Sequence, residues 1–348
     1  MITTSPAPVV ALPPQPQAVS IPPRESLIER VPHIDPMAAF ESAPPPIDLL
    51  FEGGPMVGTV GTIYSRGGLG KSYLVTELAC AIASADLVGR DVPNPGDLLD
   101  IKPTQPGHVV YLSYEDPAII TTARLHAMGA KFRLDVRRAI ADRLHIIPIM
   151  GYAEDYLLSD GGLADDLINW CLKNPTRLIV IDTISRAHQL DENSNPEMSL
   201  LLAILERIAR STGAAVLYVH HTSKGAVLNG LGTMAQAARG ASALIDNCRW
   251  AAYLAPMTAK EADTVSDDYQ TKNPIEEKNW WRYVMFGVSK SNYVTPIEPR
   301  WLWRDDGGVL VPASDLYPVP PAEEYGQGAR PVQPAGISKR KGYGIATY

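Results

Sequence analysis

The feature that most constrains the fold is an apolar run that leads through a glycine-rich turn into a helix. The run covers Val57–Tyr64. After the turn, apolar residues recur at helical spacing: Leu74, Val75, Leu78, Ala79 and Ile82. The turn and the start of the helix comprise Ser65, Arg66, Gly67, Gly68, Leu69, Gly70, Lys71 and Ser72. A strand, a turn and a helix in this order predict a phosphate-binding loop within an α/β fold.

The residue types in this turn suit a nucleotide triphosphate. Glycines let the backbone direct its N–H groups toward an anion, and the helix adds the positive end of its dipole. We expect Lys71 to reach the β- and γ-phosphates and the Ser72 hydroxyl to hold Mg²⁺. The usual motif has glycine where this chain has Ser65. The alternative, a β–α turn with an incidental lysine, does not account for the flanking strand and helix.

Proline usage predicts the domain boundaries. Twelve prolines fall within the first 46 residues, and the last residues of the chain are again rich in proline, glycine and charge. Such segments bury too little apolar surface to order, so residues 1–33 and 317–348 are predicted to be disordered. Residues 34–316 remain as one α/β domain. Within it, a short helix is predicted over Asp35–Ser42, with Asp35 as its N-cap.

Composition argues against several classes of protein. No basic segment followed by an apolar run begins the chain, and no stretch approaches the roughly 18 apolar residues of a membrane span. The three cysteines are far apart and form no zinc or redox motif, which predicts a cytoplasmic protein. The formal charge of −7 argues against binding of nucleic acid through a general basic surface, although a few local loops can still bind it.

The remaining pattern predicts a mostly parallel sheet. Apolar strands are expected at 108–114, 144–150, 178–181 and 214–219. Helices are expected between them, at 118–128, 134–141, 163–172 and 197–211. This alternation is typical of a parallel sheet covered on both faces. Four later segments predict shorter strands of an antiparallel extension, at 248–254, 281–289, 301–303 and 309–312, and 86–107 is predicted to be a loop.

Polar residues follow the predicted strands, at the sheet edge where α/β proteins bind ligands. Asp182 ends the strand 178–181, and beside a phosphate loop it is predicted to bind Mg²⁺ rather than to cap a turn. Glu115 and Asp116 follow the strand 108–114, and the sequence barely separates them. Because Asp116-Pro117 fits a helix cap, Glu115 is predicted to be the general base.

Two histidines and a glycine-rich loop follow the last apolar strand. His220 and His221 must point to opposite faces of the sheet, and His221, nearer the loop, is predicted to sense the γ-phosphate. The alternative is one packed and one exposed histidine without a ligand. Residues 199–250 include five basic residues and two acidic ones, which predicts a locally basic surface that could bind a nucleic-acid backbone.

With these residues assembled, the chain resembles the RecA-like hexameric replicative helicases of the AAA-type P-loop NTPases, and among them the RepA-type helicases of IncQ-like broad-host-range plasmids. The resemblance covers roughly residues 34–315. It is carried by Ala43–Asp48, Ser65–Ser72, Tyr111–Pro117, Asp182–Arg186, His220–Gly225, Arg239–Ser242, Asp246–Trp250 and Phe286–Tyr293.

The resemblance implies a homohexameric ring that hydrolyses ATP with Mg²⁺ at subunit interfaces and moves along single-stranded DNA as a helicase. The process would be replication of a plasmid or mobile element, with replication initiator or primase proteins as further partners. Residues 34–50 would dock on the neighbouring subunit. No primase or zinc domain is recognised in the sequence.

The resemblance also implies roles for individual residues. The catalytic set would be Lys71, Glu115, Arg239 and His221, and the metal set Ser72 and Asp182. Arg239 matches an arginine finger that acts on the neighbouring subunit. Lys290 matches the first residue of a trans-acting Lys-x-Arg pair whose third position here is Asn292. Arg186 and Lys224 would contact DNA in the central channel.

The sequence is also compatible with two other functions. The first is a RecA- or KaiC-like regulatory ATPase that switches a protein partner, which the acidic net charge favours slightly. The second is a non-catalytic nucleotide-binding assembly with proline-rich arms, which Glu115 and Asp182 argue against.

Overall fold

The computed structural model describes residues 28, 31–87, 95–222 and 242–320. The chain divides into two compact units, Met1–Pro46 and Ile47–Tyr348. In the first unit, α1 (Pro36–Glu41) begins as predicted, because Asp35 accepts hydrogen bonds from the Met37 and Ala38 N–H groups. The disorder predicted for the two ends concerns residues that lie almost entirely outside the described ranges, so it stays a prediction.

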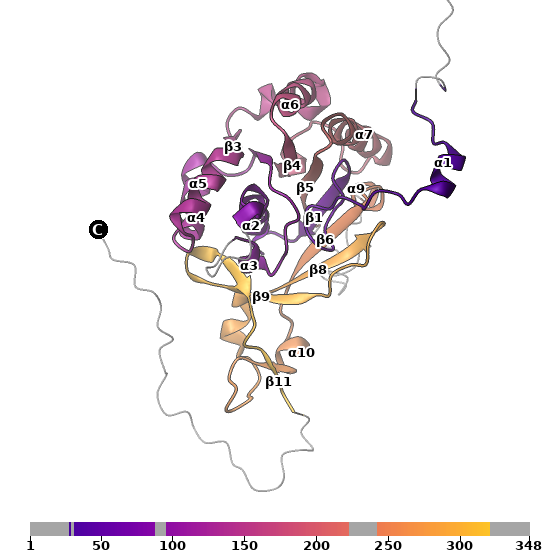
Figure 1. Cartoon of the computed structure of the whole chain (residues 1–348). Coiled ribbons are helices and arrows are strands. Elements are labelled where there is room, and N and C mark those ends of the chain that lie inside the picture. The colour runs from indigo at the N-terminus through magenta and orange to yellow at the C-terminus, as the bar shows by residue number, and fades with distance from the viewer. Residues whose placement is uncertain (1–27, 29–30, 88–94, 223–241, 321–348) are drawn as a thin grey trace, which may run out of the picture. The chain divides into compact units, whose positions relative to one another are not determined.

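The second unit is built on a nine-stranded sheet with the order β10-β9-β8-β6-β1-β5-β4-β2-β3 (Figure 1). Its strands are β1 (Val60–Ser65), β2 (His108–Ser113), β3 (Leu144–Pro148), β4 (Thr176–Asp182), β5 (Ala215–His221), β6 (Trp250–Pro256), β8 (Tyr283–Ser291), β9 (Arg300–Arg304) and β10 (Leu310–Pro312). The predicted fold class is confirmed in its architecture: an α/β core with a mostly parallel sheet flanked by helices and an antiparallel C-terminal extension.

Two predictions about the later strands are wrong in part. The segment 248–254 was assigned to the antiparallel extension, but β6 pairs with β1 in parallel, and antiparallel pairing begins only at β8. β6 is buried along almost its whole length, as central parallel strands are. The predicted tail also starts too early, since β11 (Tyr317–Pro318) pairs with β7 (Val265–Ser266).

The helices follow the predicted alternation closely. They are α2 (Lys71–Ala83), α3 (Pro95–Leu99), α4 (Ala118–Gly129), α5 (Leu134–Arg143), α6 (Gly162–Lys173), α7 (Asn195–Thr212), α9 (Ser242–Asp246) and α10 (Ala259–Ala262). α3 lies in the stretch predicted to be a loop. There Pro95 is the first helical residue, a position that proline tolerates because no N–H is needed.

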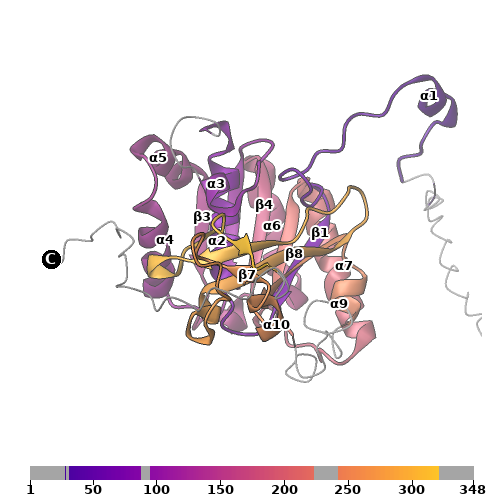
Figure 2. The same cartoon turned by 90° about the horizontal axis from the view of Figure 1, so that it is seen from below.

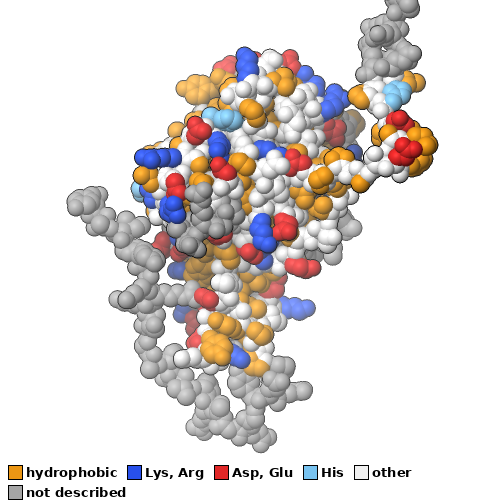
Figure 3. All heavy atoms as spheres, in the orientation of Figure 1, with side chains coloured by type: hydrophobic (Ala, Val, Ile, Leu, Met, Phe, Trp, Pro, Cys, Tyr) orange, Lys and Arg blue, Asp and Glu red, His pale blue; other side chains and the backbone are white. Residues whose placement is uncertain are grey.

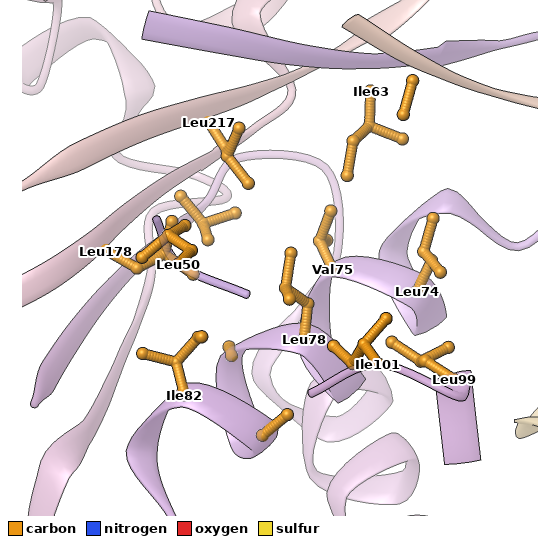
Figure 4. Close-up of a cluster of buried hydrophobic side chains, with 14 of the residues drawn as sticks. Leu50, Ile63, Leu74, Val75, Leu78, Ile82, Leu99, Ile101, Leu178 and Leu217 are labelled. Carbon is orange, nitrogen blue, oxygen red and sulfur yellow. The ribbon is translucent and has the colours of Figure 1, made fainter. Parts of the chain in front are cut away.

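Two layers of helices cover the parallel strands. α2 packs its apolar residues against one face, where Leu74, Val75 and Leu78 meet Ile63, Leu178 and Leu217 (Figure 4). α6 and α7 cover the other face (Figures 1 and 2). In β4, Leu178 and Val180 belong to the first core and Ile179 and Ile181 to the second, as alternation along a buried strand requires. This packing fixes the helix that begins at the glycine-rich turn.

The surface of the described residues carries charges of both signs. On the face seen in Figure 3, Lys and Arg side chains are interspersed with Asp and Glu. Within the described ranges, no helix has the length and apolar character needed to cross a membrane.

Candidate nucleotide-binding site

The glycine-rich turn has the open geometry of a phosphate cradle. β1 ends at Ser65 and α2 begins at Lys71. Between them, Gly68 and Gly70 have φ of 80° and 93°, in the left-handed region that favours glycine. A Cβ atom at Gly68 would meet nothing within 4 Å, so the turn borders open space rather than packed side chains. The turn can therefore admit an anion against its backbone.

The Lys71 ammonium lies at this turn among several acceptors. Its Nζ is 3.1 Å from the carbonyl oxygens of Ser65 and Arg66 and 3.2 Å from Nδ1 of His221. Burial lowers the pKa of Lys71 to about 8, while the negative charges of Asp182 and Glu115 act in the opposite direction. A phosphate would give the desolvated ammonium a negatively charged partner, which the carbonyl oxygens and the ring nitrogen do not provide.

Asp182 is a buried carboxylate at the carboxyl end of β4. It is 2% exposed, and Tyr111 donates a hydrogen bond of 2.5 Å to its Oδ2. Burial raises the pKa of Asp182, and the hydroxyls of Tyr111 and Ser72 lower it. Its other oxygen, Oδ1, is buried and has no hydrogen-bond partner among the described residues.

This donor set fits a magnesium ion bound together with a nucleotide. A hydroxyl and a free carboxylate oxygen are hard oxygen ligands of the kind Mg²⁺ prefers. In the described part of the chain, no three His, Cys, Asp or Glu side chains gather into a metal cluster. Ser72 and Asp182 would therefore hold the ion with phosphate oxygens and water as its remaining ligands.

Glu115 and His221 complete a line of contacts that starts at Lys71. Nε2 of His221 is 3.2 Å from Oε1 of Glu115, while Nδ1 faces Lys71. Because the lysine donates to Nδ1, the proton of a neutral His221 ring belongs on Nε2, where it is donated to Glu115. The hydrogen bond from His221 holds the pKa of Glu115 below its usual value, against the opposite effect of burial. Glu115 is thus an ionised acceptor.

Arg186 lies at the outer side of the same carboxylate. Its Nε is 3.9 Å from Oε1 of Glu115, and its side chain is 56% exposed. It stands in the short helix Ile184–Arg186 that follows β4. The predicted DNA contact is therefore adjacent to the predicted base.

The structure separates the two carboxylates that the sequence left close. Asp116 was predicted to cap the next helix, but the N-cap of α4 is Pro117 without a side-chain hydrogen bond. Asp116 instead pairs with Arg124 at 2.6 Å, because that arginine lies two turns into α4. β2, the strand that precedes Glu115, is separated from β1 by β5 and β4. Glu115 is therefore linked to Lys71 through His221, which contacts both side chains.

His220 and His221 point to different surroundings, as the alternation along β5 predicts. His220 is 4% exposed, and its Nδ1 has no hydrogen-bond partner among the described residues. Burial lowers its pKa to about 4, and the nearby His221, Lys71 and His188 act in the same direction. His221 alone of the two reaches the line of contacts between Lys71 and Glu115.

Lys224, Arg239 and Lys290 are the predicted site residues that remain. Lys224 and Arg239 fall outside the described residues. Lys290 pairs with Ala251, which in turn pairs with Thr62 in the middle of β1, so it is not brought to the carboxyl ends of the strands. Its ammonium donates to the carbonyl oxygen of Asp246.

Two residues at the site were not predicted from the sequence. Tyr111 contacts Asp182, and its only signal is a polar-tipped ring inside an apolar strand. Arg304 comes from β9, and its Nη2 is 3.4 Å from the carbonyl oxygen of Gly68 in the turn. No local pattern could reveal Arg304, because β9 meets the turn only through long-range folding.

A comparison with known families covers the residues of this site. A sequence model of the family described as AAA domain matches residues 22–227, which include the turn, Glu115 and Asp182. Among solved structures, the chain is similar to one described as an "ATPase Domain", with 15% identity, 73% of this chain and 84% of that chain covered, and a TM-score of 0.48. It is also similar to a structure described as a "DnaB-Like Replicative Helicase And Its Interactions With Primase", with 14% identity, coverage of 73% and 57%, and a TM-score of 0.48.

Proposed function

Because this chain belongs to the AAA domain family, we propose that it is an enzyme that hydrolyses ATP with Mg²⁺. The observation that carries the proposal is the line of contacts from Lys71 through His221 to Glu115. It joins a group that would bind the γ-phosphate to a group that would activate water. A nucleotide-binding protein without turnover has no need of the second.

The chemistry follows from the position of each group. The turn and Lys71 would hold the β- and γ-phosphates, and Ser72 and Asp182 would hold the ion, which neutralises charge that develops on the phosphate oxygens. Glu115 would accept a proton from a water molecule as its oxygen attacks the γ-phosphorus. The bond between that phosphorus and the bridging oxygen breaks, leaving ADP and phosphate.

His221 would report the state of the γ-phosphate. A bound phosphate competes with Nδ1 of His221 for the Lys71 ammonium, and this competition alters the hydrogen bond from His221 to Glu115. His221 stands at the end of β5, directly before the segment that contains Lys224 and Arg239. Hydrolysis would thereby reach the segment proposed to contact DNA.

We propose that the enzyme is a ring-shaped helicase of the RepA type, a homohexamer acting in plasmid or mobile-element replication in the cytoplasm. The basic excess over residues 199–250 supports single-stranded DNA as the ligand, with Arg186 and Lys224 as its contacts. Arg239 and Lys290 would act on the neighbouring subunit, and replication initiator or primase proteins are the partners proposed.

The test is ATP hydrolysis with and without single-stranded DNA, on protein whose mass is measured by light scattering. We expect a ring whose turnover rises several-fold with DNA and which displaces an annealed strand. Lys71→Ala should abolish turnover. Rings that hydrolyse ATP but neither respond to DNA nor displace a strand would contradict the helicase and favour a regulatory ATPase.

A charge-matched pair of double variants sharpens this test. Arg186→Ala with Lys224→Ala should remove the stimulation by DNA and retain turnover without DNA. Lys173→Ala with Arg207→Ala removes the same charge from α6 and α7, where Arg207 pairs with Asp165 on the surface. This control should keep the stimulation. Equal behaviour of the two double variants would place the DNA contacts elsewhere.

A further inference from the structure

A buried tyrosine supports the carboxylate proposed to bind Mg²⁺. Tyr111 on β2 is 1% exposed and pairs in register with Val180 of β4, two residues before Asp182. Side chains two residues apart on a strand share a face, so Tyr111 and Asp182 both point toward α2. The Tyr111 hydroxyl donates to Oδ2 of Asp182 at 2.5 Å.

This hydrogen bond makes the two carboxylate oxygens inequivalent. Oδ2 is bound by the phenol, while Oδ1 is buried without a hydrogen-bond partner in the described part of the chain. We propose that Tyr111 is a positioning residue, which holds Asp182 in the one rotamer that offers Oδ1 to the Mg²⁺ of bound ATP. The inference rests on the proposed function.

The tyrosine is itself fixed by the helix of the phosphate loop. Thr76 lies one turn after Ser72 on α2, where its hydroxyl donates to the carbonyl oxygen of Ser72 and lies beside the Tyr111 hydroxyl. The Tyr111 ring also belongs to the core that packs α2 on the sheet. The chain of contacts Thr76–Tyr111–Asp182 therefore ties β4 to the same helix that supplies the Ser72 hydroxyl, so both metal-binding groups are set by one element.

Because a hydrogen bond at Oδ2 restricts rotation of the carboxylate, the unpartnered Oδ1 keeps a fixed direction in which to bind an ion. Partners that orient a ligating side chain typically contribute 10–100-fold to metal affinity or activity. Phenylalanine at 111 fills the same space without a donor. It would leave Oδ2 without its partner and allow the carboxylate to rotate away from the ion.

The experiment compares Tyr111→Phe with Tyr218→Phe. Tyr218 is also fully buried, and its hydroxyl donates to the carbonyl oxygen of Leu244 in the core on the opposite face of the sheet. Each variant is titrated with a fluorescent ATP analogue in EDTA and then with Mg²⁺, and ATPase activity is measured across the same Mg²⁺ range. Urea unfolding without nucleotide records the stability of both variants.

We expect Tyr111→Phe to bind the metal-free nucleotide like the wild type and to need roughly 10–100-fold more Mg²⁺ for half-maximal turnover. Turnover should recover at saturating Mg²⁺, and Tyr218→Phe should keep the wild-type Mg²⁺ requirement. An unchanged Mg²⁺ requirement in Tyr111→Phe would overturn the inference. A loss of affinity for the metal-free nucleotide as large as the change in Mg²⁺ requirement would also overturn it, since that would show a general effect on the fold.

A second variant keeps the inference testable if Tyr111→Phe does not fold. Thr76→Val retains the volume of the side chain and the Tyr111 hydroxyl but removes the α2 hydroxyl that lies beside it and donates to the carbonyl oxygen of Ser72. It should shift the Mg²⁺ requirement in the same direction by a smaller factor, and no shift would overturn the inference. A wild-type protein that binds no nucleotide at all would instead contradict the proposed function.

Discussion

The two halves of the candidate site differ in how they are held. Lys71, Asp182 and Tyr111 form a buried half, with exposures of 5%, 2% and 1%, and their partners come from the core strands and α2. Glu115, His221 and Arg186 form an open half, with side-chain exposures of 31%, 37% and 56%. Packing fixes the groups that would bind the nucleotide, whereas solvent and weak contacts surround those that would respond to it.

This difference separates two kinds of substitution. A change in the buried half alters the core and the chemistry together, because a buried polar group that loses its partner destabilises the fold. A change at Glu115 or His221 in the open half should alter turnover, and one at Arg186 the response to DNA. Each should leave the free energy of unfolding close to that of the wild type, as most surface substitutions do.

The largest effect is expected from a residue that would complete the open half from a neighbouring subunit. Arg239→Ala should bind ATP and hydrolyse it about 10³-fold or more slowly, because an arginine finger neutralises charge in the transition state. Mixing Arg239→Ala with Lys71→Ala should restore part of the activity, since each subunit supplies what the other lacks. The steady-state ATPase activity of the mixture measures this. If mixing restores nothing, Arg239 does not act in trans.

Glu115→Gln should reduce turnover by roughly 10²–10⁴-fold, the usual contribution of a general base. Nucleotide affinity and the urea midpoint should change little, because Glu115 is partly exposed and its ionic partners among the described residues are His221 and Arg186. Asp116→Asn is the matched control, since its carboxylate is adjacent in sequence but pairs with Arg124. The control should retain turnover within a few-fold. Equal losses of turnover in both variants would contradict the assignment of Glu115, rather than Asp116, as the general base.

The adjacent histidines His220 and His221 allow the effect of burial on stability at low pH to be tested. His220 has its pKa lowered to about 4 by burial, with His221, Lys71 and His188 acting in the same direction. Between about pH 6.5 and 4 the unfolded chain binds a proton that the folded protein does not, so stability should fall as the pH drops through this range. The loss should amount to about 3 kcal/mol.

His220→Phe should flatten this acid limb of the stability curve, measured by urea unfolding between pH 7 and pH 4. His221→Phe is the control in the open half and should leave the limb in place. A limb that survives His220→Phe would show that other groups cause it.

The sequence predicted the parts of the site that depend on local order. The turn and the strand that ends at Asp182 are continuous segments whose residue types and periodicity are visible without tertiary structure. Strand direction is not local, and β6 was therefore misassigned to the antiparallel extension. At Asp116 a local cap signal was overridden by an ion pair with Arg124, formed when α4 folded beside it.

Contacts between distant segments could not be predicted in the same way. Tyr111 reaches Asp182 only because β2 lies beside β4, and Arg304 reaches the turn only because the fold brings β9 close to Gly68. Single-sequence patterns contain neither the strand order nor the register. The missed residues are thus those whose roles depend on topology rather than on neighbouring residue types.

Arg304 offers the smallest and most local test of the comparison, since it comes from the C-terminal extension rather than from either half. Its guanidinium donates to Gly68 of the turn, and within the described ranges no ion pair includes it. Burial lowers the pKa of Arg304, as expected for a cation without a counterion. A phosphate bound in the turn would supply that counterion, so Arg304→Ala should weaken nucleotide binding about tenfold, the equivalent of one charged hydrogen bond.

Arg300→Ala is the control for this prediction. Arg300 starts the same strand and carries the same charge, but it pairs with Asp100 at 2.7 Å. Equilibrium titration with a fluorescent ATP analogue should therefore separate the two variants, with Arg300→Ala near the wild-type affinity. Equal affinity of Arg304→Ala and wild type would restrict the binding site to the parallel core. A selective loss would instead show that the extension contributes a third group of contacts, one that neither the buried nor the open half supplies.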